Sequence, residues 1–379
     1  MTERRPSGRL IRCPGGYKAF VPDPLPPRLG WTAQLANALS DADRAIGRLA
    51  GEGRRLPNPH LLIRPFVKRE AVLSSRIEGT QATLGELLAV EAGAAVERSP
   101  ADLREVANYV TALEHGVARL TKLPLSLRLV RELHARLMEG VRGETADPGH
   151  FRRSQNWIGR SGCTLTTATY VPPPPDRLMK CLGLWERFLH DTSLPPLVQI
   201  GLAHSQFEAI HPFVDGNGRV GRLLITLFLI EREILPAPLL YLSAFFEATR
   251  AEYYARLLGV TEHGEWEAWL RYFLTGVARQ AEDAVSRAQR IDELLVSWRV
   301  KVGRIASKPG VDMIDLLAEN PFCTATGVAK RLRIAFTTAQ RAIDRLEAAG
   351  VVVRASEARR NRVYCARAIL DILEEPARA

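Results

Sequence analysis

The chain has 379 residues, which is enough for two or three domains. Its composition, with 46% hydrophobic and 25% charged residues, is that of a globular protein. No apolar run is long enough to span a bilayer, and the N-terminus lacks the apolar core of a signal peptide, so we expect a cytoplasmic protein with no membrane partner. Five scattered cysteines argue against a zinc site or a disulfide framework. The net charge of +10 permits contact with nucleic acid without establishing it.

The N-terminal third is expected to be an extended arm followed by helices. Residues 1–30 are rich in Pro, Gly and Arg, which predicts an arm that wraps a domain. Gly79 is placed to cap a helix, and His134 has apolar neighbours without a partner cluster, so we interpret it as a packing residue. Apolar periodicity predicts helices over Thr32–Ala50, Phe66–Ile77, Gln81–Ala95, Ala101–Leu120 and from Pro124 to Met138.

Residues 151–175, the hairpin segment, differ from the helical pattern around them. They mix β-branched and aromatic residues with Gly and Thr, and Asn156–Ile158 can pair with Thr167–Val171 around Gly159 to Gly162. An edge strand offers unpaired N–H and C=O groups to an extended peptide. The alternative is a hairpin that only stabilises the fold. Four prolines then precede a helix predicted to begin near Asp176.

Residues 211–222, the motif segment, lie between two strongly apolar helical runs, 194–210 and 220–230. Gly216 and Gly218 permit backbone angles that a side chain would forbid, so successive N–H groups can converge on one point. This nest precedes a helix, and the N-terminus of a helix favours phosphate. The segment therefore predicts an anion site, with a glycine turn between two core helices as the alternative.

Four side chains of the motif segment suit phosphate chemistry. Arg219 and Arg222 are three residues apart, so they share a helix face and can clamp neighbouring phosphates. Asp215 beside a polyphosphate is the kind of ligand that Mg²⁺ needs. His211 titrates near neutrality and can accept the proton of an attacking hydroxyl. Together they predict transfer from a nucleotide to a hydroxyl.

The motif segment, His-Pro-Phe-Val-Asp-Gly-Asn-Gly-Arg-Val-Gly-Arg, resembles the Fic family signature H-P-F-x-[DE]-G-N-G-R-x-x-R at every fixed position. The resemblance implies AMP transfer from ATP to a Ser, Thr or Tyr hydroxyl of a target protein, which docks on the hairpin segment as an added strand. It implies that His211 is the base and Asp215 the Mg²⁺ ligand. The implied phosphate-binding residues are Gly216, Asn217, Gly218, Arg219, Val220, Gly221 and Arg222.

The resemblance extends to two further positions. Ser74 to Gly79 matches [ST]-x-x-x-E-[GN], which is similar to the inhibitory helix of Fic proteins. There the glutamate, here Glu78, pairs with the second motif arginine, here Arg222, and denies it to the γ-phosphate of ATP. Tyr254 matches an aromatic position of the adenine pocket, beside Tyr253 and Leu257. Aromatic residues at helical spacing are also common in protein cores.

The C-terminal region, after a boundary at Ser307–Gly310, resembles a winged helix with three helices and a basic-tipped hairpin. The predicted helices are Val311–Ala318, Ala325–Leu332 and Thr337–Ala348, and the β stretches are Val351–Arg354 and Arg362–Cys365. DNA contact would use Thr337, Thr338, Gln340, Arg341 and Arg345 of the third helix, with Arg359, Arg360 and Arg362 of the wing. Asp344 and Glu347 weaken that interpretation, so DNA binding and protein contact both stay open.

We therefore expect a mainly α protein: a Fic-type helical core with a β-hairpin flap, followed by a winged-helix domain. The expected divisions are residues 1–100, with an inhibitory helix over about 66–79, then 101–305 as the catalytic core and 306–379 as the winged helix. The expected function is a protein adenylyltransferase that uses ATP and Mg²⁺ and is inhibited by Glu78. The alternatives are an ATP-sensing transcriptional regulator and an enzyme that removes AMP, and a homodimer stays open.

Overall fold

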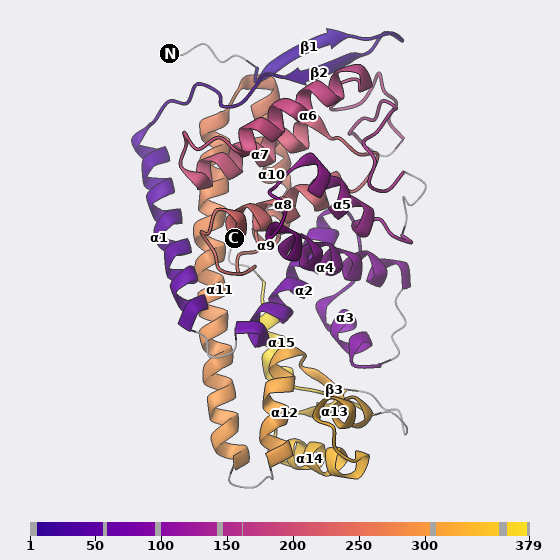
Figure 1. Ribbon diagram of the computed structural model, residues 1–379, viewed down its shortest axis with the longest axis vertical. Coiled ribbons are helices and arrows are strands. Elements are labelled where there is room, and N and C mark those ends of the chain that lie inside the picture. The colour runs from indigo at the N-terminus through magenta and orange to yellow at the C-terminus, as the bar shows by residue number, and fades with distance from the viewer. Residues whose placement is uncertain are drawn as a thin grey trace.

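The computed structural model describes residues 6–55, 59–94, 100–141, 147–160, 162–303, 308–355 and 362–376. The chain is mainly helical, as expected (Figure 1). The larger hydrophobic cluster of its described residues extends from Leu35 to Leu373. None of the described helices is both long and apolar enough to cross a membrane. The helices up to the motif segment are α1 (Ala33–Arg55), α2 (Pro59–Ile77), α3 (Leu84–Glu91), α4 (Pro100–Leu120), α5 (Leu127–Leu137), α6 (Pro175–Leu189) and α7 (Pro196–Ile210).

Helix α8 (Asn217–Glu231) lies at the centre of the helical core because nearly all of its residues are buried. It contacts α2, α4, α5 and α7, so the helix that follows the motif loop is held on several sides. After it come α9 (Ser243–Ala248) and α10 (Arg250–His263). Helix α11 (Trp266–Gly303) has 38 residues and runs beside α1.

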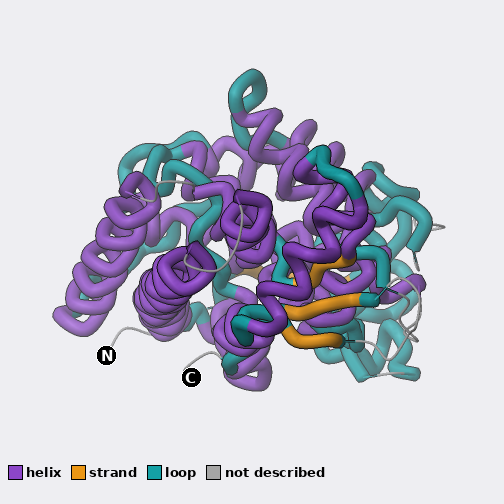
Figure 2. The backbone as a smooth tube through the Cα atoms, turned by 90° about the horizontal axis from the view of Figure 1, so that it is seen from below, coloured by secondary structure: helices purple, strands orange, loops and turns teal. Residues whose placement is uncertain are grey.

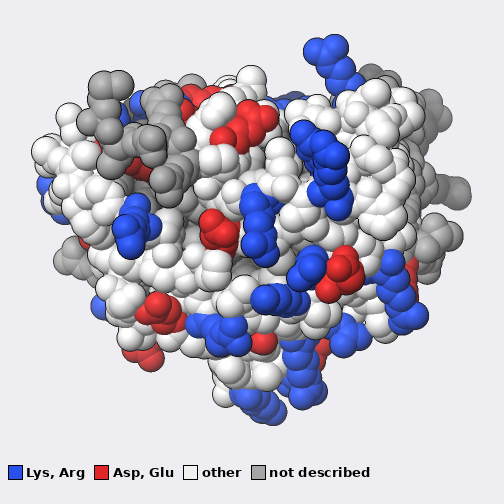
Figure 3. Space-filling model, turned by 90° about the horizontal axis from the view of Figure 1, so that it is seen from above, with Lys and Arg blue, Asp and Glu red and all other residues white. Residues whose placement is uncertain are grey.

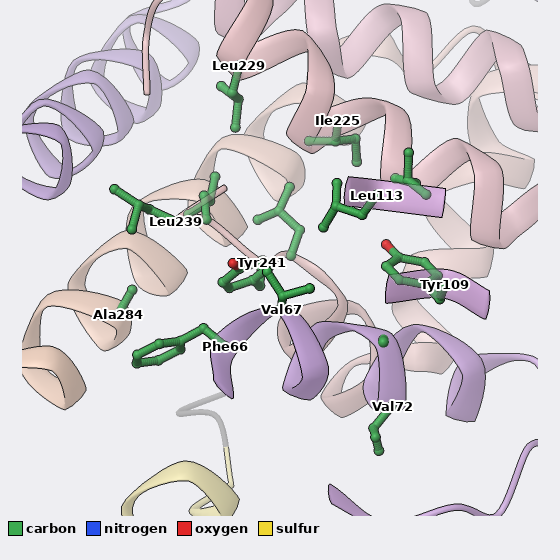
Figure 4. Packing of buried hydrophobic residues seen from close by; sticks show 14 of the residues in the cluster. Phe66, Val67, Val72, Tyr109, Leu113, Ile225, Leu229, Leu239, Tyr241 and Ala284 are labelled. Atoms are coloured by element: carbon green, nitrogen blue, oxygen red, sulfur yellow. The ribbon is translucent and has the colours of Figure 1, made fainter. Parts of the chain in front are cut away.

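Helix α2 begins at Pro59 and continues through Pro65, whereas the sequence predicted a start at Phe66. A proline inside a helix removes one backbone hydrogen bond. Packing compensates here, because Phe66 and Val67 are buried and Phe66 stacks on Tyr241 with 6.3 Å between ring centroids (Figure 4). Helix α3 is shorter than predicted and starts at a capping box between Thr83 and Glu86.

The N-terminal arm is not merely extended, as predicted, but contains a β-hairpin. Strands β1 (Gly8–Arg12) and β2 (Lys18–Pro22) pair antiparallel from Gly8–Pro22 to Arg12–Lys18. The turn is possible because Gly15 and Gly16 take φ values of +93° and +82°. Phe20 N donates to Val171 O at 2.8 Å, so β2 lies beside the end of the hairpin segment. Figure 3 shows this end of the molecule, where basic side chains are scattered among larger uncharged areas.

The C-terminal unit, defined as α12 through α15, packs through α12 on α2 and α11 (Figure 1). Its three-stranded antiparallel sheet has the order β3-β5-β4 (Figure 2). Strand β3 and helix α15 were not predicted from the sequence. The elements are α12 (Lys308–Glu319), β3 (Phe322–Thr324), α13 (Ala325–Leu332), α14 (Phe336–Ala348), β4 (Val353–Arg354), β5 (Val363–Cys365) and α15 (Arg367–Glu374).

The winged-helix assignment and the three-part division of the chain stay predictions. On α14, Arg341 and Arg345 are exposed, but Gln340 donates to Asp344 at 2.7 Å and to Tyr364 at 3.2 Å. Gln340 is therefore engaged within the unit itself. Arg359 and Arg360, predicted as wing contacts, lie outside the described residues.

Candidate active site

His211 ends helix α7 in a left-handed conformation, with φ +49°, which is uncommon for a residue other than glycine. Its Nδ1 lies 3.3 Å from Glu208 O. Because a carbonyl oxygen only accepts, Nδ1 carries the hydrogen and Nε2 keeps its lone pair. Burial lowers the pKa of His211 to about 4, so the imidazole is neutral at neutral pH. This side chain can accept a proton.

The turn after His211 is held by the Asn217 side chain. Its Oδ1 accepts from Phe213 N at 2.8 Å and its Nδ2 donates to Phe213 O at 2.9 Å. Gly216 takes φ +76° as the N-cap of α8, and the first helical bond runs from Val220 N to Gly216 O. The first N–H groups of α8 therefore have no partner within the helix. The predicted phosphate-binding residues thus come together at one helix N-terminus.

Asp215 is half exposed, and its Oδ1 accepts from Gly216 N at 2.6 Å. Among the described residues no group of three or more His, Cys, Asp or Glu gathers to hold a metal. A single accessible carboxylate fits a magnesium ion that takes its remaining ligands from phosphate and water.

Arg219 is buried beside Asp215. Its NH1 lies 3.7 Å from Glu105 Oε2 and its NH2 lies 3.8 Å from Asp215 Oδ1. Within the described part of the chain its Nε and NH1 make no hydrogen bond. Buried donors normally have acceptors, so this side chain is suited to an anion that brings them.

Arg222 has different partners from Arg219, all of them at the end of α2. It donates through NH2 to Glu78 Oε1 at 2.6 Å and to Ser74 O at 3.0 Å, and through Nε to Ser74 Oγ at 2.9 Å. Burial favours the neutral acid of Glu78, but the charge and hydrogen bond of Arg222 outweigh it and lower the pKa of Glu78. The pair that the sequence predicted is formed, with Ser74 as an additional acceptor.

Two glycines of α8 leave room for carboxylates. A Cβ on Gly218 would collide with Glu78 Oε1, and one on Gly221 would collide with Glu208 Oε1. Glu208 Oε1 is buried and has no hydrogen-bond partner among the described residues, and burial raises the pKa of Glu208 to about 7. The sequence analysis missed Glu208, because only the folded chain brings α7 against Gly221.

Arg152 was also missed, and it holds the backbone around His211. It is buried, and its guanidinium donates to His211 O at 2.9 Å, to Ile210 O at 3.4 Å and to Pro173 O at 2.5 Å. The backbone N–H of Arg152 donates to Pro212 O at 2.9 Å. The sequence carried no signal for this role, since the adjacent Arg153 is exposed and looks the same in the chain.

Among its described residues, 151–160 and 162–175, the hairpin segment has one β-bridge, between Ile158 and Tyr170, in place of the predicted pair of strands. It is tied to the motif segment, because Asn156 Nδ2 donates to Phe213 O at 2.8 Å, and to the end of α7, because Tyr170 Oη donates to Ala209 O at 2.6 Å. Trp157 and Ile158 remain exposed at 43% and 39%. The segment thus places an apolar, accessible edge beside the motif segment.

Of the predicted adenine-pocket residues, only Tyr254 is accessible, with 43% of its surface exposed. Tyr253 is buried, and its hydroxyl lies 2.9 Å from Nε2 of His204. Leu257 is partly buried against the core. Tyr253 is therefore a core residue, while Tyr254 can still offer a ring face.

Comparison with known proteins places this site in a family. The family model "Fic/DOC family N-terminal" matches residues 36–118, and "Fic/DOC family" matches residues 124–229. The protein adenylyltransferase Fic of Drosophila virilis is 31% identical over 202 residues, 52% of this chain and 38% of that protein. That of Drosophila ananassae is 29% identical, also over 202 residues, and 37% of it is covered. The chain therefore spans well under half the length of these curated relatives.

Solved structures show the same fold. A Fic family protein from Desulfovibrio desulfuricans G20 superposes with a TM-score of 0.60 at 22% identity, covering 90% of this chain and 98% of that one. Fic-1 from C. elegans superposes with a TM-score of 0.52 at 25% identity, covering 69% and 74%. With its motif segment and both matched models, this chain belongs to the Fic/DOC family and is distantly related to the protein adenylyltransferases Fic.

Proposed function

We propose that this protein transfers AMP from ATP to a Ser, Thr or Tyr hydroxyl of a target protein. The observation that carries the proposal is the grouping at the start of α8: His211 with a free Nε2, the accessible carboxylate of Asp215, and buried Arg219 with unmet donors. Relatives of about 30% identity named protein adenylyltransferase Fic support it.

In the proposed reaction, His211 Nε2 accepts the proton of the target hydroxyl while the hydroxyl oxygen attacks the α-phosphorus of ATP. The new P–O bond joins AMP to the target, the bond to the β-phosphate oxygen breaks, and pyrophosphate leaves. The amides of Gly216 to Gly218 and the Arg219 guanidinium would hold the phosphates, with Gly216 N exchanging its present acceptor, Asp215 Oδ1, for a phosphate oxygen. Asp215 would hold Mg²⁺, which when bound neutralises phosphate charge.

The surroundings of the loop suit a nucleotide and a peptide. Tyr254 offers an accessible ring on which adenine can stack. The edge of the hairpin segment near Ile158 offers a place for an extended target peptide. Arg152 and Asn156 hold the backbone between these two regions, because both donate to carbonyls of the motif segment.

We also propose that the pair of Glu78 and Arg222 inhibits the reaction. The Arg222 side chain is 1% exposed and has three acceptors, two on Ser74 of α2 and one on Glu78 just after that helix, so it is not free to receive a γ-phosphate. ATP that binds with the pair intact would have its α-phosphate out of line, and such misplacement can cost about 10²-fold in rate.

A second candidate activity is removal of AMP from a modified target. It is favoured by the position of the Glu78 carboxylate, whose Oε1 lies against Gly218 in the first turn of α8. A carboxylate at that place can orient a water molecule toward a bound phosphate ester.

The experiment is incubation of wild type, Glu78→Gly and the double variant Glu78→Gly/His211→Ala with α-labelled ATP and a cell lysate. Label on protein that depends on His211 supports the proposal. Its absence from every sample would contradict it. Release of AMP from a pre-labelled target by wild type, but not by Glu78→Gly, would establish the second activity.

A further inference from the structure

Helix α5 lies against the motif segment through His134, which the sequence indicated only as a packing residue. His134 is fully buried, and its ring stacks on Phe213 with 3.7 Å between centroids and 4° between planes. Its Nδ1 lies 2.8 Å from Gly149 N and its Nε2 lies 3.1 Å from Asp215 O. The ring therefore contacts two loops from opposite sides.

These two contacts determine where the ring hydrogen resides. Gly149 N–H is a donor, so Nδ1 of His134 must accept and cannot carry a hydrogen. The hydrogen is then on Nε2, which donates to the carbonyl oxygen of Asp215. A neutral imidazole with this tautomer satisfies both neighbours, and no other state of the ring does.

Gly149 is itself held by α5. Its carbonyl accepts from Arg131 Nε at 2.7 Å, and its φ is +80°. A Cβ at this position would lie 3.0 Å from Ala135 Cβ and 3.2 Å from Arg131 O. One helix thus fixes Gly149 from two sides, and Gly149 in turn fixes the tautomer of His134.

The Asp215–Gly216 turn depends on this arrangement. A Cβ on Gly216 would lie 2.9 Å from Met138 Sδ and 3.5 Å from the His134 ring, so α5 fills the space beneath the turn. We propose that His134 is a positioning residue that orients the Asp215 carbonyl, and with it the Asp215 carboxylate and the first amides of α8, for nucleotide phosphate. The inference rests on the proposed function, because it takes residues 215–218 as the phosphate site.

The test compares His134→Phe with His134→Gln, each in the Glu78→Gly protein, in which Arg222 lacks its carboxylate partner. Phenylalanine keeps the stack on Phe213 but can neither donate to Asp215 O nor accept from Gly149 N. Glutamine carries an amide N–H about where Nε2 lies, so it can restore the donor. His115→Phe is the matched control, since His115 pairs with Glu132 away from the motif segment. Titration calorimetry measures ATP affinity with and without Mg²⁺, and thermal unfolding confirms that each variant is folded.

We expect His134→Phe to weaken ATP binding in the presence of Mg²⁺ by about 10-fold, the usual cost of leaving a buried acceptor unpaired. His134→Gln should recover most of the loss, and His115→Phe should bind as its parent does. A folded His134→Phe variant with unchanged affinity would overturn the inference, as would equal losses for Phe and Gln. If the parent binds ATP but labels no protein, the proposed function fails while the His134 comparison still stands on affinity. A parent that binds no ATP would overturn both.

Discussion

Glu78 and Arg222 are 144 positions apart in the chain, yet Arg222 NH2 donates to Glu78 Oε1 at 2.6 Å. The contact exists because α2 packs on α8 and brings Ser74 and Glu78 to the second motif arginine. The C-terminal unit packs on the same helix through α12. Glu78, the side chain that would control nucleotide binding, therefore directly follows a helix that contacts both α8 and the C-terminal unit.

Replacing Glu78 with glycine should raise AMP transfer by about 10²-fold, including self-modification, because Arg222 loses its carboxylate partner and keeps only neutral acceptors on Ser74, which a γ-phosphate can displace. Label transfer from α-labelled ATP measures this. Glu91→Gly is the control, since Glu91 also ends a helix but pairs with Lys68. Arg222→Ala should not mimic Glu78→Gly, because it removes a phosphate ligand. Wild type as fast as Glu78→Gly would contradict inhibition.

In the Glu78→Gly background, His211→Ala should lower AMP transfer by about 10²–10⁴-fold, the usual effect of losing a general base. ATP affinity should change little, because the proposed phosphate ligands are Gly216 to Arg222 and not His211. Single-turnover transfer and calorimetry measure the two quantities separately. His263→Ala, which alters an exposed histidine, serves as the control. Transfer at the parent rate would show that His211 is not the base.

Asp215→Ala in the same background should make transfer nearly insensitive to added Mg²⁺, because activity is low at every concentration. The accessible carboxylate of Asp215 is the group proposed to hold the ion. A magnesium titration of the variant and its parent, read as label transfer, tests this. Superimposable titration curves would rule out the metal role.

The pH dependence should reflect the low pKa of His211, which burial brings to about 4 in the free protein. A lowered pKa keeps the base unprotonated, so kcat/KM should be flat between about pH 6 and pH 8. Bound phosphates add negative charge, which favours the imidazolium and raises the pKa of His211 in the ATP complex. The acid limb of kcat should therefore lie at higher pH than the acid limb of kcat/KM. Measurements of kcat and kcat/KM for the Glu78→Gly variant across this pH range test both expectations. A kcat/KM midpoint near the ordinary histidine value would contradict the lowered pKa of His211.

Arg152→Met should lower the free energy of unfolding by about 1–3 kcal/mol, because the carbonyls of Ile210 and His211 lose a buried donor. AMP transfer should fall with it, since His211 would no longer be held at φ +49°. Denaturant unfolding and label transfer measure the two effects. Arg153→Met is the matched control, because Arg153 is adjacent and exposed. Equal effects of the two substitutions would exclude a special role for Arg152.

Local patterns in the sequence were enough to predict the local structure of the motif segment. Its twelve residues are contiguous, so the turn, the helix start and the side chains that project from them follow from glycine conformation and helix spacing. Apolar periodicity likewise predicted most helices and a mainly helical fold. The pairing of Glu78 with Arg222 came from the resemblance, because nothing local links the two positions.

Tertiary structure decided what depends on neighbours distant in the chain. Arg152 and Arg153 are identical in type, but only Arg152 meets the carbonyls around His211. Tyr253 and Tyr254 differ in exposure because helix α10 turns one of them toward His204. The ring hydrogen of His134 is set by Gly149 and Asp215, which lie 15 and 81 positions away. Sequence spacing reports which residues share a helix face, but only packing determines what that face meets.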